Sequence, residues 1–364
     1  MKKSINKFLS KELIINLLII AAFAIISLTY FYPLLSGKQI KQSDIDQFAG
    51  MSKQIVDHRE KYEEEPFWLD NAFLGMPSYQ VLVKYPFDFL DKIDKIIRFL
   101  PRPADYLFVY LVSFFLLLLS MKVKSEYAFF GAIAFAFSTY LIIILGVGHN
   151  TKALAIGYAP LIFAGLFKIL DNKYLQGFII ASIGLGLQIN ANHYQMTYYF
   201  LMLVGLITVV YIINDITKKD IKSGFRKLAI VFSTVLFGIL LNASSILATQ
   251  EYTDFSTRGK SEISINPDGT EKENLGGLSN DYITEYSYGK LESFNLIVPR
   301  FMGGGSSDLI DKDSEFVKEI RKYDNESANI IYRNARLYWG DQPIVAAPAY
   351  IGISVFYIFL ISLF

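Results

Sequence analysis

Long uncharged apolar blocks alternate with polar segments along the chain. A helix needs about 20 apolar residues to cross a bilayer core roughly 30 Å thick. Apart from Lys152 and Lys168 at the ends of one block, the blocks contain no Asp, Glu, Lys or Arg. The blocks are Leu13–Leu35, Tyr106–Met121, Tyr127–Gly148, Lys152–Leu170, Gln176–Asn190, His193–Ile213, Leu228–Thr249 and Ile344–Phe364. The pattern predicts an all-α polytopic membrane protein with about eight transmembrane helices.

Two apolar stretches are too long to be single spans. Residues 127–170 would extend roughly 66 Å as one helix at 1.5 Å per residue, which is about twice the bilayer core. The only polar break with glycine in that stretch is Gly146–Thr151, and Asn190–Gln195 interrupts residues 176–213 in the same way. We therefore expect two helical hairpins with polar tips.

The distribution of basic residues predicts the orientation. Lysines precede the first block at Lys2, Lys3, Lys7 and Lys11, and alternate later gaps hold Lys122 and Lys124, Lys168 and Lys173, and Lys218, Lys219, Lys222, Arg226 and Lys227. Cytoplasmic loops carry the excess of Lys and Arg. The long stretches Ser36–Asp105 and Gln250–Pro343 then both face the outside. The expected organisation is a membrane domain over 1–249, a hydrophilic outer loop over 250–343 and an eighth span over 344–364.

Both outer stretches show local order in their pattern. Apolar positions Phe48, Met51, Ile55 and Tyr62 predict a helix that begins near Ser43. Residues Pro86–Leu100 predict a second helix, which suits the membrane interface or packing on other loops equally. In the second stretch, Ser264–Gly277 is expected to be an exposed loop and Phe316–Arg336 to be helical.

Composition excludes several classes of function. With 35 Lys and Arg against 34 Asp and Glu, the chain has no basic excess with which to neutralise nucleic-acid phosphates. The chain has no cysteine, which excludes disulfides, cysteine-type zinc sites and thiol catalysis.

Candidate chemistry gathers on the predicted outer side. An acidic pair, Asp44 and Asp46, follows the first apolar block, and carboxylates of this kind act as general bases or metal ligands. The two hairpin tips supply groups that can bind a substrate or stabilise a phosphate leaving group, namely His149, Asn150 and Lys152 in one tip and Asn190, Asn192, His193 and Gln195 in the other.

Each of these residues also has a structural explanation. Ser43 as N-cap with Asp44 and Asp46 in the first turn is a favourable helix start. Lys152 can extend its ammonium to the membrane surface. The histidines and asparagines of the tips can satisfy the backbone of the turns. The residue types alone leave both explanations open.

Several segments together resemble the YfhO-like family of bacterial membrane proteins, within the GT-C superfamily of membrane glycosyltransferases. They are Gln42–Gln47, Phe67-Trp68, Phe73–Tyr79, Gly148–Lys152, Ala191–Tyr199, Ser287–Gly289, Val298–Gly304 and Tyr338–Pro343. These segments extend from the first loop to the last span, and chains of that family are longer. We therefore expect this sequence to be an N-terminal portion.

The resemblance implies a GT-C-like fold in the cytoplasmic membrane of a bacterium, with the N-terminus in the cytoplasm. It implies transfer of a sugar from a polyprenyl-phosphate-linked donor to an envelope glycopolymer, such as lipoteichoic acid, or to a lipid. Asp44 and Asp46 match the catalytic or metal-binding acids, for which Mg²⁺ or Mn²⁺ is the expected ion. A flippase or transporter of lipid-linked sugars and a non-catalytic glycolipid-binding protein are the alternatives.

Overall fold

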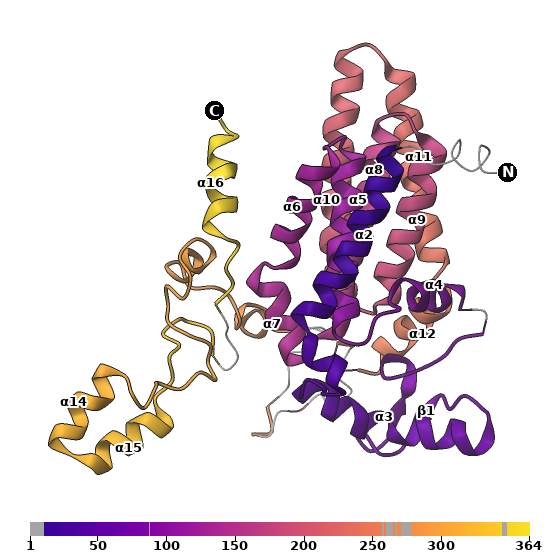
Figure 1. Ribbon diagram of the computed structural model, residues 1–364. Coiled ribbons are helices and arrows are strands. Elements are labelled where there is room, and N and C mark those ends of the chain that lie inside the picture. The colour runs from indigo at the N-terminus through magenta and orange to yellow at the C-terminus, as the bar shows by residue number, and fades with distance from the viewer. Residues whose placement is uncertain are drawn as a thin grey trace. The chain divides into compact units, whose positions relative to one another are not determined.

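The computed structural model describes residues 11–86, 88–256, 258–259, 265, 268–270, 278–343 and 348–364 (Figure 1). The chain forms two compact units. The first comprises Met1–Ala136 with Ile144–Asp254, and the second comprises Phe137–Ile143 with Phe255–Phe364. Most of the predicted exposed loop 264–277 lies outside the described residues.

The first unit is a bundle of apolar helices. Its main helices are α2 (Lys11–Tyr30), α5 (Ala104–Ser120), α6 (Ser125–Ala136), α8 (Asn150–Leu170), α9 (Tyr174–Asn190), α10 (Tyr194–Thr217) and α11 (Ile221–Leu240), followed by the short α12 (Ala243–Thr253). Helix α8 packs against α5 and α9, α9 packs against α11, and α2 packs against α5. The core therefore lies around α8 and α9.

Glycines bring α8 and α9 into close contact. A Cβ atom at Gly177 would lie 2.6 Å from the carbonyl oxygen of Gly165, and one at Gly184 would lie 2.8 Å from the Cβ of Leu161. Small residues at such positions allow helix backbones to approach closely, which is how membrane helices pack without a hydrophobic driving force between them.

Four described helices are long and apolar enough to cross a membrane, namely α2, α8, α10 and α11. A fifth candidate is the pair formed by α6 and α7 (Thr139–Val147), which is bent by 48°. Helix α5 is apolar but has only 17 residues. The structure thus confirms a helical membrane protein, and the number of eight spans stays a prediction.

Two predicted spans differ from the observed helices. The block Leu228–Thr249 is divided between α11, which ends at Leu240, and α12, which begins at Ala243. Helix α11 begins earlier than expected, at Ile221, because a buried ion pair accommodates Lys227 inside it. Of the block Ile344–Phe364, residues 344–347 lie outside the described part, and the helix α16 covers only Ile353–Ile361. The helix begins after its N-cap residue Gly352, whose φ of +99° is not helical.

Both hairpin tips are confirmed. Helix α7 ends at Val147 and α8 begins at Asn150, while α9 ends at Asn190 and α10 begins at Tyr194. Gly148 and Asn192 have positive φ angles of 94° and 60°. These left-handed residues end each helix sharply and let the chain reverse within two or three residues.

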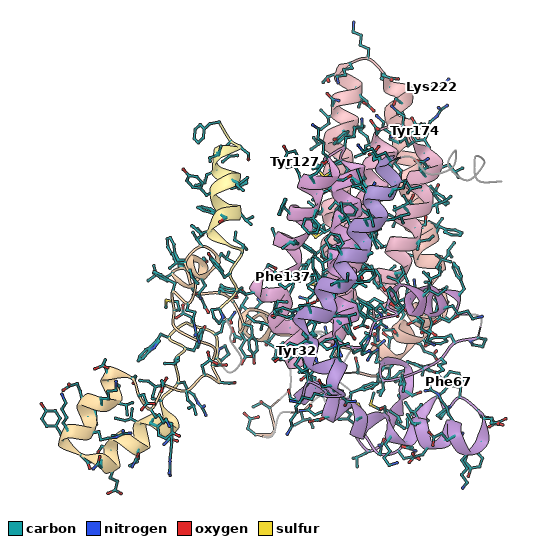
Figure 2. The ribbon with its side chains drawn as sticks, in the orientation of Figure 1. Tyr32, Phe67, Tyr127, Phe137, Tyr174 and Lys222 are labelled. Carbon is teal, nitrogen blue, oxygen red and sulfur yellow. The ribbon has the colours of Figure 1, made fainter. Side chains whose placement is uncertain are left out.

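The two ends of the bundle carry different segments (Figure 2). Tyr127, Tyr174 and Lys222 lie at one end, next to the basic segments, and Tyr32 and Phe67 lie at the opposite end. The basic segments that follow α5, α8 and α10 therefore lie at one end of the bundle and the first long loop at the other, as the alternation of charge predicts.

The first long loop is an ordered cap on the bundle. It contains the 3₁₀ turns η1 (Tyr32–Ser36) and η2 (Ser78–Gln80), the predicted helix α3 (Ser43–Tyr62) and a short antiparallel hairpin of β1 (Trp68–Leu69) and β2 (Met76–Pro77). Buried Ile55 of α3 packs with Leu69 and Met76 of the hairpin. This small core holds the hairpin against α3.

Helix α4 (Phe89–Ile97) corresponds to the helix predicted over Pro86–Leu100. Of the two placements expected for it, the structure shows packing on protein. Leu90 is 1% exposed and lies in a cluster with Tyr158 of α8 and Leu187 of α9. The face of α4 with Leu90, Ile93 and Ile97 therefore packs on the bundle, while Phe89 and Ile96 are exposed.

The second unit contains α13 (Asn280–Thr284), η3 (Glu292–Leu296), α14 (Glu315–Tyr323), α15 (Asn325–Asn334) and α16. The helix expected over Phe316–Arg336 is present as α14 and α15. Asp324 separates them because its backbone is extended and its side chain accepts hydrogen bonds from the N–H groups of Glu326 and Ser327.

A buried glutamate organises the middle of the second unit. Glu292 is 2% exposed and accepts hydrogen bonds from the backbone N–H of Gly289 at 3.1 Å and from the hydroxyl of Tyr338 at 2.6 Å. Desolvation and the bond to Glu292 raise the pKa of Tyr338 to about 12. Because the backbone N–H of Trp339 also donates to the carbonyl of Met302, the segments Ser287–Gly289, Val298–Gly304 and Tyr338–Pro343 meet here.

Candidate functional site

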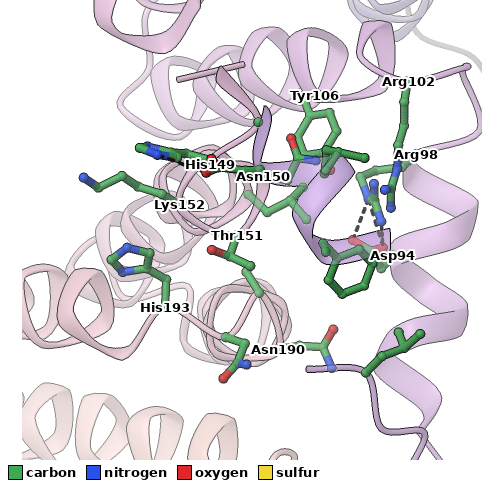
Figure 3. A pocket seen from close by; sticks show the side chains of 18 of the residues that line it. Asp94, Arg98, Arg102, Tyr106, His149, Asn150, Thr151, Lys152, Asn190 and His193 are labelled. Atoms are coloured by element: carbon green, nitrogen blue, oxygen red, sulfur yellow. Dashed lines mark hydrogen bonds and ion pairs between the residues drawn. The ribbon is translucent and has the colours of Figure 1, made fainter. Parts of the chain in front are cut away.

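A cavity of about 610 Å³ lies where α3, α4 and both hairpin tips meet, within the first unit (Figure 3). It is lined by Asp44, Ile45, Phe48, Gln80, Val81, Leu82, Asp91, Asp94, Arg98, Arg102, Tyr106, Gly148, His149, Asn150, Thr151, Lys152, Leu154, Tyr158, Leu187, Asn190, Ala191, Asn192 and His193. Its size is within the usual range for small-molecule sites.

The predicted acid of the first loop meets the first hairpin tip. The Oδ2 atom of Asp44 lies 3.2 Å from Nε2 of His149, and both side chains are a little under half exposed. The residue at the N-cap of α3 is Gln42 rather than Ser43, and no side chain caps the helix there. Ser43 is thus not the N-cap, but Asp44 and Asp46 both lie in the first turn of α3, as the structural explanation expects, and Asp44 also contacts the histidine.

Close contacts hold the first turn of α3 on this tip. The side-chain amide of Gln42 donates to the carbonyl of Leu145. Gly148, with φ of +94°, lies under the turn, and a Cβ atom there would lie 3.1 Å from Cβ of Gln42 and 3.3 Å from Cβ of Asp44. The absence of a side chain at Gly148 thus sets the distance between Asp44 and His149.

Replacing Gly148 by alanine should weaken this contact. The positive φ and the crowded Cβ together are expected to lower the free energy of unfolding by about 1–3 kcal/mol. Thermal unfolding of the purified protein in detergent measures the loss. Gly146→Ala is the matched control, because its Cβ would have no neighbour within 4 Å. Equal melting temperatures for the two variants would contradict the proposed contact.

Cationic and imidazole groups face one part of the cavity. Figure 3 shows His149, Lys152 and His193 together on one side, with Arg98 and Arg102 on the other. Burial lowers the pKa of His193, and the nearby Lys152 and His149 lower it further. His193 is therefore neutral at neutral pH, when one ring nitrogen donates and the other accepts a hydrogen bond.

Two buried amide oxygens in the cavity wall have no donor among the described residues. The Oδ1 atoms of Asn150 and Asn192 are buried and have no hydrogen-bond partner within the described part of the chain. The amide nitrogen of Asn192 donates to Oε1 of Gln80 at 3.0 Å, which orients the group. Buried acceptors without a partner are costly, and donors on a bound molecule would satisfy them.

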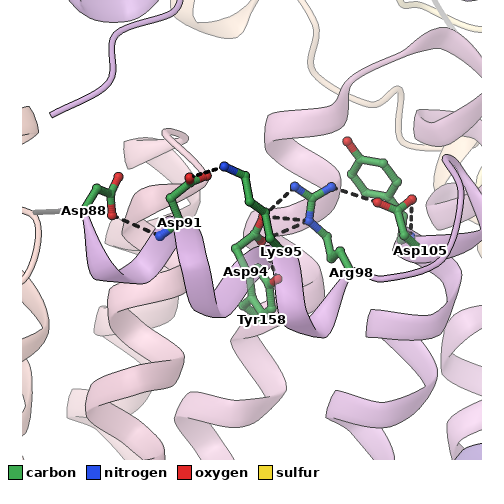
Figure 4. Close-up of polar contacts among 8 residues, drawn as sticks. Asp88, Asp91, Asp94, Lys95, Arg98, Asp105 and Tyr158 are labelled. Atoms are coloured by element: carbon green, nitrogen blue, oxygen red, sulfur yellow. Dashed lines mark hydrogen bonds and ion pairs between the residues drawn. The ribbon is translucent and has the colours of Figure 1, made fainter. Parts of the chain in front are cut away.

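A buried charge network forms the inner wall (Figure 4). Arg98 donates from Nε to both carboxylate oxygens of Asp94, at 3.0 and 2.9 Å, and from Nη1 to Oδ2 of Asp105 at 2.8 Å. The hydroxyl of Tyr158 donates to Oδ1 of Asp94 at 2.6 Å. Burial lowers the pKa of Arg98, but its bonds to Asp94 outweigh this and raise it overall. The network joins α4 to α5 and α8.

Sequence reasoning missed this network. Asp94 and Arg98 were expected away from the apolar side of the helix predicted over Pro86–Leu100, and Tyr158 lay in an apolar block. The available signal was the i, i+4 spacing of Asp94 and Arg98 on the same face as Leu90, since residues with that spacing are neighbours on a helix. A charged pair on the apolar face of a helix must be buried together.

Seven predicted site residues line the cavity, and two do not. The seven are Asp44, His149, Asn150, Lys152, Asn190, Asn192 and His193. Asp46 is exposed outside it, because residues two apart on a helix face different directions. Gln195 is exposed and donates to the hydroxyl of Tyr199 at 2.8 Å.

The expected Mg²⁺ or Mn²⁺ site at Asp44 and Asp46 has few ligands. Among the described residues, no set of three or more His, Asp or Glu side chains is placed to hold a metal ion. Asp44 is paired with His149, and Asp46 lies outside the cavity wall. These donors do not fit a metal centre built by the protein alone, and the reaction proposed for this site uses no metal ion.

Comparison with known proteins gives no relative. Neither a family model, nor a curated protein, nor a solved structure matches this chain. Function therefore has to be argued from the cavity itself.

Proposed function

We propose that this protein is a GT-C-type membrane glycosyltransferase of the YfhO-like family. In this proposal it moves a sugar from a polyprenyl-phosphate-linked donor to an envelope glycopolymer or lipid. The observation that supports it best is the pair of Asp44 and His149 in a cavity that also holds cations and amide acceptors. Such a wall combines a proton acceptor, groups that stabilise a phosphate and groups that bind sugar hydroxyls.

Asp44 is the base in the proposed reaction. A hydroxyl oxygen of the acceptor attacks the anomeric carbon of the donor, and its proton passes to the carboxylate of Asp44. The bond between the anomeric carbon and the phosphate oxygen breaks, and the polyprenyl phosphate leaves with the electron pair. His149 orients the Asp44 carboxylate through the 3.2 Å contact, so it is a positioning residue.

The leaving phosphate gains negative charge as the bond breaks. Lys152 and the neutral imidazole of His193 are proposed to stabilise it, by charge and by hydrogen bonding respectively. Asn150 and Asn192 would accept hydrogen bonds from sugar hydroxyls, which orients the anomeric carbon toward the acceptor.

The proposed membrane placement puts the cavity at the outer surface of a bacterial cytoplasmic membrane. The basic segments of the opposite bundle end would face the cytoplasm together with the N-terminus, and about eight helices would span the bilayer. A lipid-phosphate donor is reached only near a membrane surface. The position of the cavity at one end of the apolar helices supports this placement.

The decisive comparison is Asp44→Asn against Asp46→Asn. Both changes keep the shape of the side chain, but only Asp44 lines the cavity. In a strain that lacks the native gene, Asp44→Asn should abolish one sugar addition in the mass spectrum of envelope glycolipids and glycopolymers. Asp46→Asn should leave that addition intact. The amount of each protein in the membrane is measured as the control for expression.

Other outcomes would support other functions. If Asp44→Asn leaves the glycans unchanged while deletion of the gene alters them, Asp44 is not the base and a binding or transport role is favoured. If Asp46→Asn is as damaging as Asp44→Asn at equal protein level, the assignment of the base from the cavity wall is wrong.

A further inference from the structure

The second unit carries an exposed tryptophan on an ordered backbone. Trp339 is 76% exposed, but its backbone N–H donates to the carbonyl of Met302 at 2.9 Å, and Tyr338 beside it forms a β-bridge with Gly303. A Cβ atom at Gly303 would lie 2.9 Å from Cδ1 of Trp339, so the indole packs over this glycine. Most of the indole is nevertheless open to solvent.

A charged pair packs over the next glycine. A Cβ atom at Gly304 would lie 2.6 Å from Oδ2 of Asp308 and 2.9 Å from Nη2 of Arg300. Cβ atoms at Gly303 and Gly304 would both also lie within 3.0 Å of Leu337. The indole and the charged pair are therefore neighbours, and the two glycines allow both to approach the same stretch of backbone.

Arg300 and Asp308 offer hydrogen-bonding groups next to the indole. Nη2 of Arg300 donates to Oδ2 of Asp308 at 2.5 Å, and this oxygen also accepts from the backbone N–H of Gly305 at 3.0 Å. The side chains of Arg300 and Asp308 are 59% and 46% exposed. A guanidinium has several N–H donors and a carboxylate has a second oxygen, so the pair can bind a ligand without breaking its own contact.

This combination suits a carbohydrate better than a lipid or a protein. One face of a pyranose ring carries C–H groups that stack on an indole, and the hydroxyls at its edge can bond to guanidinium and carboxylate groups. A charged pair beside the indole opposes insertion into hydrocarbon. A standard protein interface buries about 800 Å² on each side, which is far more than one indole and one ion pair supply.

We propose that the second unit binds a glycan through Trp339, Arg300 and Asp308. One sugar ring stacks on the open face of the indole, and its hydroxyls bond to the ion pair. The inference rests on the proposed function in one respect, because the expected ligand is the envelope glycopolymer that accepts the transferred sugar.

Fluorescence can report on this site alone, because the chain has two tryptophans. In a Trp68→Phe background, Trp339 is the remaining one. Envelope glycopolymer from a strain that lacks the native gene is titrated into the purified full chain in detergent. We expect the emission maximum of Trp339 to shift to shorter wavelength, because a stacked sugar removes water from the indole. The same polymer after periodate oxidation, which opens sugar rings, should cause no shift.

Two further variants test the contacts. Arg300→Met should weaken binding by about tenfold or more, as expected when a charged hydrogen bond is lost. The matched control is Arg321→Met, because Arg321 is exposed on α14 of the same unit and lies outside this cluster. Calorimetric titration of Trp339→Ala in the otherwise native chain should show a similar loss, which makes the result independent of the Trp68→Phe background.

Three results would overturn the assignment. An unshifted emission maximum with intact polymer would show that no glycan stacks on Trp339. An equal shift with oxidised polymer would show that the ligand is not a carbohydrate. Quenching of Trp339 by a brominated detergent would place the indole in the apolar phase.

Asp44→Asn separates this inference from the proposed function, because glycan binding requires no sugar transfer. If Asp44→Asn keeps the sugar addition while Trp339→Ala loses the polymer, the glycan site stands and the transferase assignment fails. If Asp44→Asn loses the sugar addition while Trp339→Ala binds the polymer normally, the transferase stands and the glycan site fails.

Discussion

Replacing Arg98 by methionine is expected to lower the free energy of unfolding by about 3–5 kcal/mol, the usual cost of removing one partner from a buried ion pair. The variant leaves Asp94, at 7% exposed, and Asp105, at 1% exposed, without the guanidinium that both contact. Methionine keeps an unbranched apolar stem but removes the guanidinium, so most of the lost stability comes from the missing charge and its hydrogen bonds. Thermal unfolding in detergent should show a fall of roughly 6–20 °C, at about 2–4 °C per kcal/mol for a unit of this size.

The same helix offers a matched control. Lys95 forms an i, i+4 ion pair with Asp91, and both side chains are well exposed. Lys95→Met should change the stability by only a few tenths of a kcal/mol, because solvent screens exposed pairs. If the melting temperature of Arg98→Met lies within a degree or two of that of Lys95→Met, the network does not stabilise the packing of α4 on the bundle.

A second large effect is expected at the opposite end of the bundle. Lys227 of α11, at 4% exposed, lies with its Nζ 2.7 Å from Oδ2 of Asp215 of α10. Lys227→Met leaves the carboxylate of Asp215 buried alone, which should cost about 3–5 kcal/mol. The matched control is Lys222→Met on the same helix, where the lysine is exposed and its loss should be nearly neutral.

The double variant Lys227→Met/Asp215→Leu decides whether the pair itself stabilises the protein. Replacing a buried ion pair by apolar side chains of similar volume is often neutral or stabilising. We expect the double variant to recover most of the stability lost by Lys227→Met. A double variant as unstable as the single one would mean that Lys227 contributes through packing of its stem rather than through its charge.

Much of both units could be predicted from local pattern. The two hairpin tips, α3 and the helices of the second outer stretch follow from apolar spacing and from glycine and asparagine positions. One error arose where a charge was buried. Lys227 inside α11 moved the start of that helix seven residues before the predicted boundary, because its partner Asp215 lies on another helix.

The candidate site could also be predicted only in part from the sequence. His149, Lys152 and His193 could be assigned to one region because they lie at the tips of predicted hairpins at the same end of the bundle. Asp46 was included with Asp44 because both are acidic and near in sequence, but the helical backbone turns the two side chains to different directions.

The sequence by itself determined that this is a helical membrane protein with polar hairpin tips and an ordered first loop. It could do so because the transfer of apolar blocks out of water and the turning of the chain at glycine and asparagine are local effects. Only the tertiary structure decided that Asp44 meets His149 and that Arg98 joins Asp94 to Asp105. Those contacts join segments whose relative placement depends on the packing of the whole bundle, and no local pattern encodes it.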